Sequence, residues 1–377
     1  MTINKNRLIR LTQKLIQINS ENPPGDESRI ADFVVKYLKD IGLKTHIYEF
    51  KKNRSNAVAV LGQKRNRHSL LVTPHLDTVP AGEDWRFGPF SGEISGDKIY
   101  GLGATDRKGD LACLMEAINS IVENNVSLGY NLIFAATADE ENGSHLGLIP
   151  LLKKGILKPD AAVVLDTDDF SIVVAQKGLL HIKVRVQGKR AHGAYPWLGK
   201  NAIDISLDIL RELKRHKFKY KAVRYLRSPT VNIGTIKGGD KVNVVADWCD
   251  FELDFRFLPG MSAKEICTYL KRLCGKYAPR FRIEIEGVQA PYLIEKDHAL
   301  VSYLRQAMYK AGARPLISGS EGATVITFFQ EMGIPAIATG FGSQGCNHIT
   351  NEYSRISNLY KGAQVLAEFF KIYRAGR

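Results

Sequence analysis

Two polar segments of this chain each follow an apolar run that is typical of a β-strand buried on both faces. Residues 69–74 lead into His75-Leu76-Asp77, and residues 131–137 lead into Asp139-Glu140-Glu141. Apolar runs of this length, bounded by turn residues, indicate a parallel sheet covered by helices. Open sheets of this kind hold their functional sites beyond the carboxyl ends of the strands. The chain is therefore expected to be an α/β protein with a site of histidine and carboxylate groups at one sheet edge.

The length and composition of the chain fit a soluble protein of two domains. At 377 residues the chain exceeds the size that one hydrophobic core usually supports. Its 44% hydrophobic and 24% charged residues are typical of globular proteins. No apolar run reaches the roughly 18 residues of a membrane span, and the polar N-terminal residues do not resemble a signal peptide. We therefore expect a protein that does not contact membranes.

The five cysteines are an odd number, are widely spaced and contain no CxxC pair. Disulfide frameworks of secreted proteins use an even number of cysteines at regular spacings. The cysteines are therefore expected to be reduced thiols in a cytoplasmic protein.

The pattern of secondary structure changes between residues 179 and 288. On both sides of this region, apolar strand-like runs alternate with helix-like ones, which predicts a mixed sheet covered by helices. Within it, strands and helices are expected in the order β-α-β-β-α-β, at residues 180–186, 201–215, 230–236, 249–257, 262–276 and 281–286. This order is the ferredoxin-like arrangement. We predict a discontinuous domain of residues 1–178 and 289–377, interrupted by an inserted domain of residues 179–288.

The net charge of +14 belongs mainly to the predicted inserted domain. Residues 179–288 contain 22 Lys and Arg residues against 11 Asp and Glu residues, with a maximum at residues 211–221. A basic balance is compatible with nucleic acid, an acidic substrate or a solvated surface. Because cationic side chains favour the C-terminus of a helix, we interpret the maximum as a solvated helix end. No nucleic-acid-binding motif is present, so binding of nucleic acid is not expected.

Five residues at strand ends or in the following loops are candidate metal ligands. Each has an ordinary alternative when it is taken alone: a surface residue, a helix cap, a turn acid or a loop histidine. The adjacent Glu140 and Glu141 are the most informative pair, because two neighbouring acids are costly to bury unless a cation balances them. Together the candidate ligands supply histidine nitrogens and carboxylate oxygens, which suit Zn²⁺, Mn²⁺ or Co²⁺. They are His75, Asp106, Glu141, Asp166 and His348.

These residues lie in motifs that resemble those of the M20 metallopeptidase family, which includes acetylornithine deacetylase, succinyl-diaminopimelate desuccinylase, aminoacylase, glutamate carboxypeptidase and several di- and tripeptidases. The resemblance covers nearly the whole chain. Its motifs are residues 75–80, 101–109, 139–143, 188–193, 201–203 and 347–352. It implies a zinc-peptidase domain of mixed α/β structure, interrupted by a ferredoxin-like domain that covers the site and forms a homodimer.

The resemblance also implies a role for each candidate residue. Asp106 matches the carboxylate that bridges two divalent metal ions, which are expected to be Zn²⁺, with Co²⁺ or Mn²⁺ as alternatives. His75 and Asp166 match the ligands of one ion, and Glu141 and His348 match those of the other. Glu140 matches the general base that acts on a metal-activated water, and Asp77 matches the residue that orients His75.

Further residues match positions that contact the substrate in this family. His192 matches a donor to the developing oxyanion, which often reaches the active site of the partner subunit. Asn243 and Arg256 match residues that hold the backbone and carboxylate of the substrate, and an arginine fork suits a carboxylate. Gly340 and Gly342 would allow the backbone to approach the substrate closely. Without the resemblance, each of these would be interpreted as an ordinary strand-end or turn residue.

Two departures from the family pattern bear on the substrate. Asp166 stands where the deacetylase and carboxypeptidase branches carry Glu, whereas several aminopeptidases carry Asp, which favours a peptide with a free amino end. Residues 319–322 read Gly-Ser-Glu-Gly where many relatives carry a Gly-Thr/Ser-Asp turn. We predict an enzyme that hydrolyses the amide bond of a small peptide or an N-acyl amino acid. The alternatives are an N-acyl amino acid deacylase, a two-metal phosphodiesterase, a non-catalytic binding protein and a nucleic-acid-binding protein.

Overall fold

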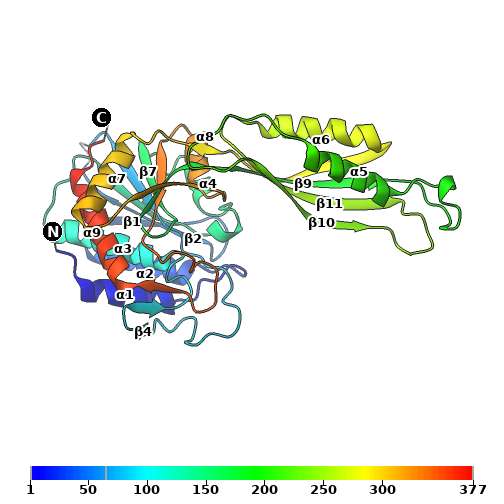
Figure 1. Cartoon of the computed structure of the whole chain (residues 1–377). Helices are drawn as coiled ribbons and strands as arrows, with labels where there is room; N and C mark the ends of the chain where they lie inside the picture. The colour runs from blue at the N-terminus through cyan, green and yellow to red at the C-terminus, as the bar shows by residue number, and fades with distance from the viewer. Residues whose placement is uncertain (1, 64–65, 376–377) are drawn as a thin grey trace. The chain divides into compact units, whose positions relative to one another are not determined.

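The computed structural model describes residues 2–63 and 66–375, and they form two compact units (Figure 1). The first unit contains the chain up to Val174, residues 294–318 and the chain from Phe328 onward. The second contains Ala175–Leu293 and Gly319–Thr327. Among the described helices, none is both long and apolar enough to cross a membrane. The five cysteines are free thiols.

The first unit is built on a mixed sheet whose central strands are parallel. Its strands are ordered β1-β2-β6-β3-β7-β15-β8. The strand β3 pairs in parallel with both β6 and β7, and β15 pairs in parallel with β7. These central strands are almost wholly apolar and buried, as expected for strands covered on both faces. Their bounds are β1 Lys44–Glu49, β2 Ser55–Leu61, β3 Ser69–Thr73, β6 Asn131–Ala136, β7 Ala161–Leu165, β8 Ser171–Gln176 and β15 Ala336–Thr339.

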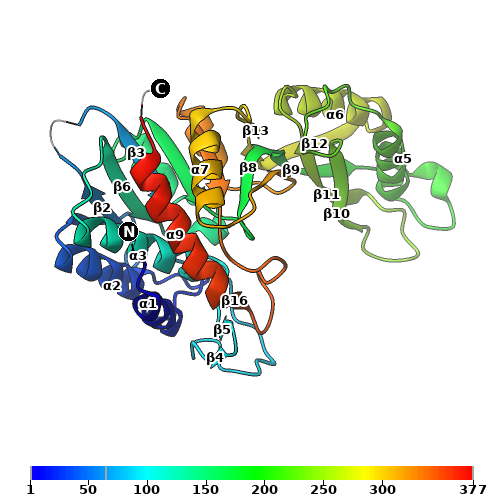
Figure 2. The same ribbon diagram turned by 60° about the vertical axis from the view of Figure 1, so that its left-hand side comes forward.

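Helices cover this sheet (Figure 2). The helix α3 is buried along nearly its whole length, because α1 and α9 pack against it. The amphipathic α2 packs on β1 and β2. The bounds are α1 Lys5–Gln17, α2 Ser28–Asp40, α3 Lys108–Glu123, α4 Leu148–Lys153, α7 Ala299–Lys310, α8 Ile326–Glu331 and α9 Ile356–Ile372. A small antiparallel sheet of β4 Ile94–Ser95, β5 Lys98–Tyr100 and β16 Tyr353–Arg355 completes the unit.

The second unit confirms the predicted ferredoxin-like arrangement. Its antiparallel sheet is ordered β10-β11-β9-β12. Along the chain, one helix follows β9 and the other follows β11, as expected. In β9 and β11 every second side chain is buried against α5 and α6, and most of the intervening side chains are polar. The bounds are β9 Gly178–Gln187, α5 Ala202–Arg215, β10 Thr230–Gly238, β11 Trp248–Phe257, α6 Ala263–Tyr277 and β12 Arg280–Gln289, with the short β13 Tyr292–Leu293 after them.

The second unit also contains residues 319–327, which the sequence analysis had grouped with the surrounding domain. Polar contacts hold this segment to the second unit. The ammonium of Lys177, which is 1% exposed, lies 2.6 Å from a carboxylate oxygen of Glu321. The hydroxyl of Thr324 donates a hydrogen bond to Gln176 at 2.9 Å. A segment distant in sequence therefore joins the unit through side chains whose pairing no local pattern indicates.

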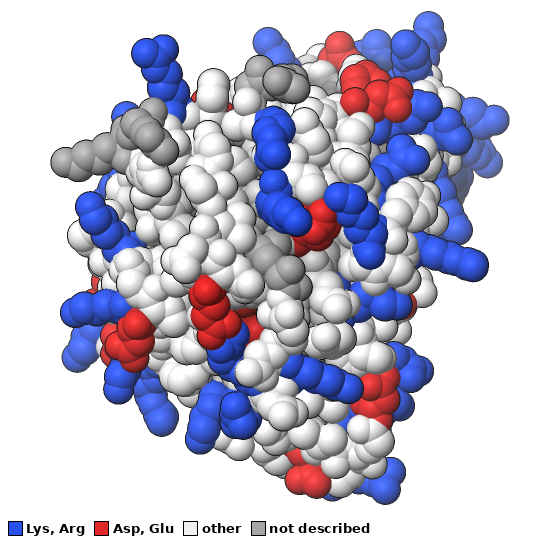
Figure 3. Space-filling model, turned by 90° about the vertical axis from the view of Figure 1, so that its left-hand side faces the viewer, with Lys and Arg blue, Asp and Glu red and all other residues white. Residues whose placement is uncertain are grey.

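Basic side chains are spread over the surface. Figure 3 shows Lys and Arg side chains distributed across one face, with Asp and Glu between them. In the second unit several basic side chains are paired, for example Arg185 with Asp250 and Arg190 with Asp240. These ion pairs use acids that the count of charges already includes, so the net positive charge of the region remains.

Candidate metal centre

The candidate ligands come together because the parallel strands β3, β6 and β7 end at the same edge of the first unit's sheet. The pairing of β3 and β6 continues beyond the strands, where the Leu76 amide donates to the Thr137 carbonyl at 2.8 Å. His75 therefore lies beside the segment that carries Glu140 and Glu141. Asp166 directly follows β7, and its amide donates to the Thr339 carbonyl at the end of β15. The sheet thus gathers residues that are far apart in the sequence.

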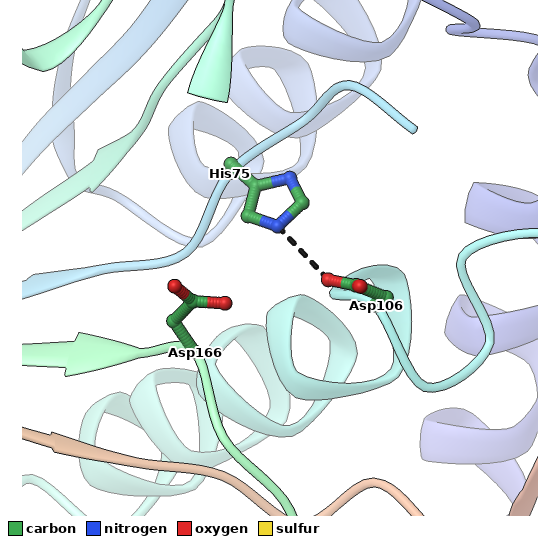
Figure 4. Close-up of side chains that lie close together, drawn as sticks. All are labelled: His75, Asp106 and Asp166. Atoms are coloured by element: carbon green, nitrogen blue, oxygen red, sulfur yellow. Dashed lines mark hydrogen bonds and ion pairs between the residues drawn. The ribbon is translucent and has the colours of Figure 1, made fainter. Parts of the chain in front are cut away.

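Two ligand sets share Asp106. The first ligand set is His75, Asp106 and Asp166, and the second ligand set is Asp106, Glu141 and His348. Within each set the candidate donor atoms all lie within 4.8 Å of one another. Figure 4 shows the first set, with the three side chains directed toward a common point.

Asp106 presents a different oxygen to each set. Its Oδ1 lies 3.1 Å from His75 Nε2, and its Oδ2 lies 3.1 Å from His348 Nε2. His348 Nε2 is also 3.2 Å from Glu141 Oε1. This donor set of two imidazoles and three carboxylates fits two divalent cations that share one carboxylate.

A buried glutamate fixes the loop that carries Asp106. Glu352 is 1% exposed, and its carboxylate accepts hydrogen bonds from the amides of Gly103, Thr105 and Asp106 at 2.9, 2.7 and 2.9 Å. Burial and the nearby Asp106 raise the pKa of Glu352 to about 7. Glu352 ends the last of the predicted motifs, where no role was expected for it, and its carboxylate shapes the loop of residues 103–106.

Asp77 contacts both polar segments from which the sequence analysis began. Its backbone carbonyl is 2.9 Å from His75 Nδ1, and its Oδ1 is 3.6 Å from the same nitrogen. Its carboxylate also accepts hydrogen bonds from the amides of Glu140 and Glu141, at 3.0 and 3.1 Å. Although burial alone would raise the pKa of Asp77, its contacts with His75 and the other donors lower it. Asp77 therefore positions the 140–141 segment as well as the imidazole of His75.

The charges of the site shift the pKa values of its members in opposite directions. Hydrogen bonds to Asp106 and Glu141 raise the pKa of His348 to about 10. Burial raises the pKa of Glu140 well above its usual range, and the negative charge of Asp166 adds to the effect. Burial opposes ionisation of Asp106, but the charge of Arg107 and hydrogen bonds from both histidines lower its pKa well below the usual range. Crowded acids of this kind are stabilised by bound cations.

A buried ion network that the sequence did not predict lies next to the site. Arg54 donates two hydrogen bonds to Glu27, at 2.7 and 2.8 Å, and a third to Asp139 at 2.9 Å. Asp139 immediately precedes Glu140 and has a left-handed backbone with φ 65°, which non-glycine residues rarely adopt. Only the position of Asp139 beside the two glutamates was a usable signal. No local pattern points to Glu27 or Arg54.

Gly340 and Gly342 lie at the end of β15 and are required by the packing of the protein itself. A Cβ atom on Gly340 would lie 1.6 Å from the Thr167 carbonyl oxygen. A Cβ atom on Gly342 would lie 2.6 Å from Thr105 Cγ2. These close contacts are sufficient to require glycine at both positions. The predicted contact of Gly340 and Gly342 with the substrate stays a prediction.

The remaining predicted residues lie in the second unit. His192 and Asn243 are exposed and adjacent, since the Gly193 amide donates to the Asn243 carbonyl at 2.8 Å. Arg256 is in β11, where its guanidinium donates two hydrogen bonds to Asp254 at 2.8 and 3.1 Å. The roles expected for these three residues stay predictions.

Comparison with known proteins establishes the class to which this fold and site belong. Residues 71–372 match the model of peptidase family M20/M25/M40, so the chain belongs to this family and is a hydrolase. It is 28% identical to an acetylornithine deacetylase of Vibrio atlanticus, over 94% of this chain and 95% of the relative. It is also similar to the crystal structure of a tripeptidase from Staphylococcus aureus, with a TM-score of 0.82, 26% identity and 99% of each chain covered. A dinuclear metal-binding peptidase of the M20 family from Bacillus subtilis has the same fold, with a TM-score of 0.76, 16% identity and 98% of each chain covered.

Proposed function

We propose that this protein hydrolyses the amide bond of a small peptide or an N-acyl amino acid, with two divalent cations held by the first and second ligand sets. The observation that carries the proposal is the sharing of Asp106, whose two oxygens face His75 and His348 at 3.1 Å each. The metals named by the sequence analysis, Zn²⁺ first and Co²⁺ or Mn²⁺ as alternatives, suit these donors. Divalent cations supply Lewis-acid chemistry, because they polarise carbonyl groups and lower the pKa of water.

Glu140 is proposed as the general base. Its pKa is raised well above the usual range by burial, and then by the charge of Asp166. A carboxylate with a raised pKa can accept a proton from the attacking water and deliver it to the leaving nitrogen. The amide of Glu140 is fixed by Asp77 at 3.0 Å, so the base is held next to the ligand sets.

The test of this role is the substitution Glu140→Gln, which keeps the shape of the side chain and removes the base. Turnover should fall by about 10²–10⁴-fold, while metal content and the circular dichroism spectrum stay unchanged. Near-normal turnover would sink the assignment of Glu140.

The second unit is proposed as a lid and dimerisation domain, and the first as the catalytic domain of a cytoplasmic homodimer. His192 is proposed to act in the active site of the partner subunit. Two inactive variants, E140Q and H192N, then complement each other when mixed, because a mixed dimer contains one complete site. Random exchange would restore about a quarter of the wild-type activity. An inactive mixture whose subunits demonstrably exchange would show that His192 does not act across the dimer.

Two classes of substrate fit the proposed reaction. The similarity to a tripeptidase and the aspartate at position 166 favour a peptide with a free amino end. The similarity to an acetylornithine deacetylase favours an N-acyl amino acid. Hydrolysis of dipeptides, tripeptides and N-acetyl, N-succinyl and N-formyl amino acids should be compared with Zn²⁺, Mn²⁺ and Co²⁺ each supplied. Cleavage confined to the acylated substrates would exclude the peptidase.

A further inference from the structure

A buried arginine contacts two members of the first ligand set, Asp106 and Asp166, but only the shared Asp106 of the second. Arg107 directly follows Asp106, and its side chain is 3% exposed. Its Nε donates to Asp166 Oδ1 at 2.9 Å and lies 3.2 Å from Asp106 Oδ1. Two of the oxygens that the first ligand set offers to a cation are therefore already in contact with a positive charge.

The other end of the guanidinium is held by groups that belong to neither ligand set. Its Nη1 donates to Asp168 Oδ1 at 2.9 Å and to the carbonyl oxygens of Thr105 and Thr167 at 3.2 and 2.9 Å. Asp110 lies 3.8 Å from the same nitrogen. In the amide orientation of Asn347 that satisfies both of its ends, the amide oxygen accepts from Arg107 Nη2 at 3.0 Å. The guanidinium is thus fixed from several sides and cannot swing away without leaving buried acids unpaired.

The two members that belong to the second ligand set alone, Glu141 and His348, lack such a neighbour among the described residues. Asp106 Oδ2 and Glu141 Oε1 face His348, and within the described part of the chain no lysine or arginine pairs with Glu141. Arginine keeps its charge at any pH that a protein tolerates. A divalent cation in the first set would therefore share two carboxylates with a permanent positive charge, whereas a cation in the second set would share only Asp106.

We propose that Arg107 makes the two metal sites unequal, so that the first ligand set binds its divalent cation more weakly than the second. The guanidinium repels the incoming ion. It also donates a hydrogen bond to one oxygen of Asp166, so that this oxygen is a weaker ligand for the ion. Substitution of groups that hydrogen-bond to metal ligands usually lowers metal affinity by about 10–100-fold, and we expect an effect of this size but of opposite sign for a cationic neighbour. Arg107 is here a positioning residue, since it acts through Asp106 and Asp166. The inference rests on the proposed metal centre.

The experiment measures metal affinity for each set separately, without turnover. The H348A variant weakens the second set and reports on the first, and the D166A variant reports on the second. Metal-free protein is equilibrated with buffered Zn²⁺, and bound zinc is measured by elemental analysis. The first set in H348A should bind at least about tenfold more weakly than the second set in D166A. Similar affinities for the two sets would overturn the inference.

Substitution of Arg107 then tests the cause. In the H348A background, R107M should strengthen zinc binding by about tenfold or more, and R107K, which keeps the charge, should leave it within about threefold. In the D166A background R107M should change little. Unchanged or weaker binding by the first set in R107M would refute the inference, because a purely structural arginine predicts that outcome. If R107M does not fold, R107M/D168N, which removes one of the acids that R107M leaves unpaired and spares both ligand sets, is measured in its place.

Failure of the metal centre itself gives a different result. If the wild type and both single-site backgrounds bind no Zn²⁺, Mn²⁺ or Co²⁺ at concentrations below about 1 mM, the proposed metal centre is wrong. If the wild type binds two ions with equal affinity that R107M does not alter, the metal centre stands and only the inference about Arg107 fails.

Discussion

Removal of Arg54 should destabilise the first unit strongly, because it leaves two buried acids without their cation. The side chains of Glu27 and Asp139 are 0% and 2% exposed, and Arg54 pairs with both. Breaking a buried ion pair by removing one partner costs about 3–5 kcal/mol of unfolding free energy. Asp139 keeps a hydrogen bond from the Leu146 amide at 3.0 Å, so part of its stabilisation remains. For Arg54→Met, which preserves the apolar stem, we expect a loss of about 3 kcal/mol.

The matched control is Lys310→Met in the same unit. Lys310 pairs with Glu368 at 2.7 Å, but their side chains are 51% and 22% exposed. An exposed pair contributes about 0–1 kcal/mol, so K310M should change stability little. The two substitutions each remove one cation from an ion pair, and burial is the main difference between them.

The assay is urea unfolding of metal-free protein, followed by tryptophan fluorescence. Trp85 is in the first unit, whereas Trp197 and Trp248 are in the second. Replacing the latter two by Phe in every variant makes Trp85 report on the first unit alone. Equal losses for R54M and K310M, or a loss below about 1 kcal/mol for R54M, would refute the reasoning. The double variant R54M/E27Q should recover part of the loss, since it removes one of the unpaired charges.

Two further outcomes follow from burial. Burial raises the pKa of Asp110 to about 8, so the folded protein keeps a proton that the unfolded chain releases near pH 4. The unfolding free energy should therefore fall as pH rises between these two values. Asp110→Asn should reduce this fall, measured by urea unfolding at pH 5 and 7.5, and an unchanged fall would exclude Asp110 as its source. Cys267 is partly exposed while the other four thiols are buried, and burial raises the pKa of Cys274 to about 12. Ellman's reagent at pH 8 should therefore modify Cys267 first in native protein and all five thiols in guanidinium without reductant; fewer than five would contradict the expectation of reduced cysteines.

Regular elements could be predicted from the sequence because their signals are local. The apolar runs at residues 69–74 and 131–137 correspond to β3 and β6, and the order of elements in residues 179–288 predicted the ferredoxin-like sheet correctly. The association of residues 319–327 with the second unit could not be predicted, because it depends on contacts such as the pairing of the buried Lys177 with the half-exposed Glu321. Such a pair is formed by tertiary contacts and leaves no periodic pattern in the sequence.

The sequence by itself determined the family of motifs and the candidate ligands, since strand ends with His and carboxylate groups recur in order along the chain. Only the tertiary structure decided how these groups are supported. Parallel pairing of β3 with β6 and β7 brings the ligands to one edge, where Asp106 faces both histidines. The contacts of Arg54, Arg107 and Glu352 join segments separated by tens to hundreds of residues, and burial gives those contacts their strength. The physical reason is that charge in a folded protein acts through space and through local polarity, neither of which is encoded by neighbours in the sequence.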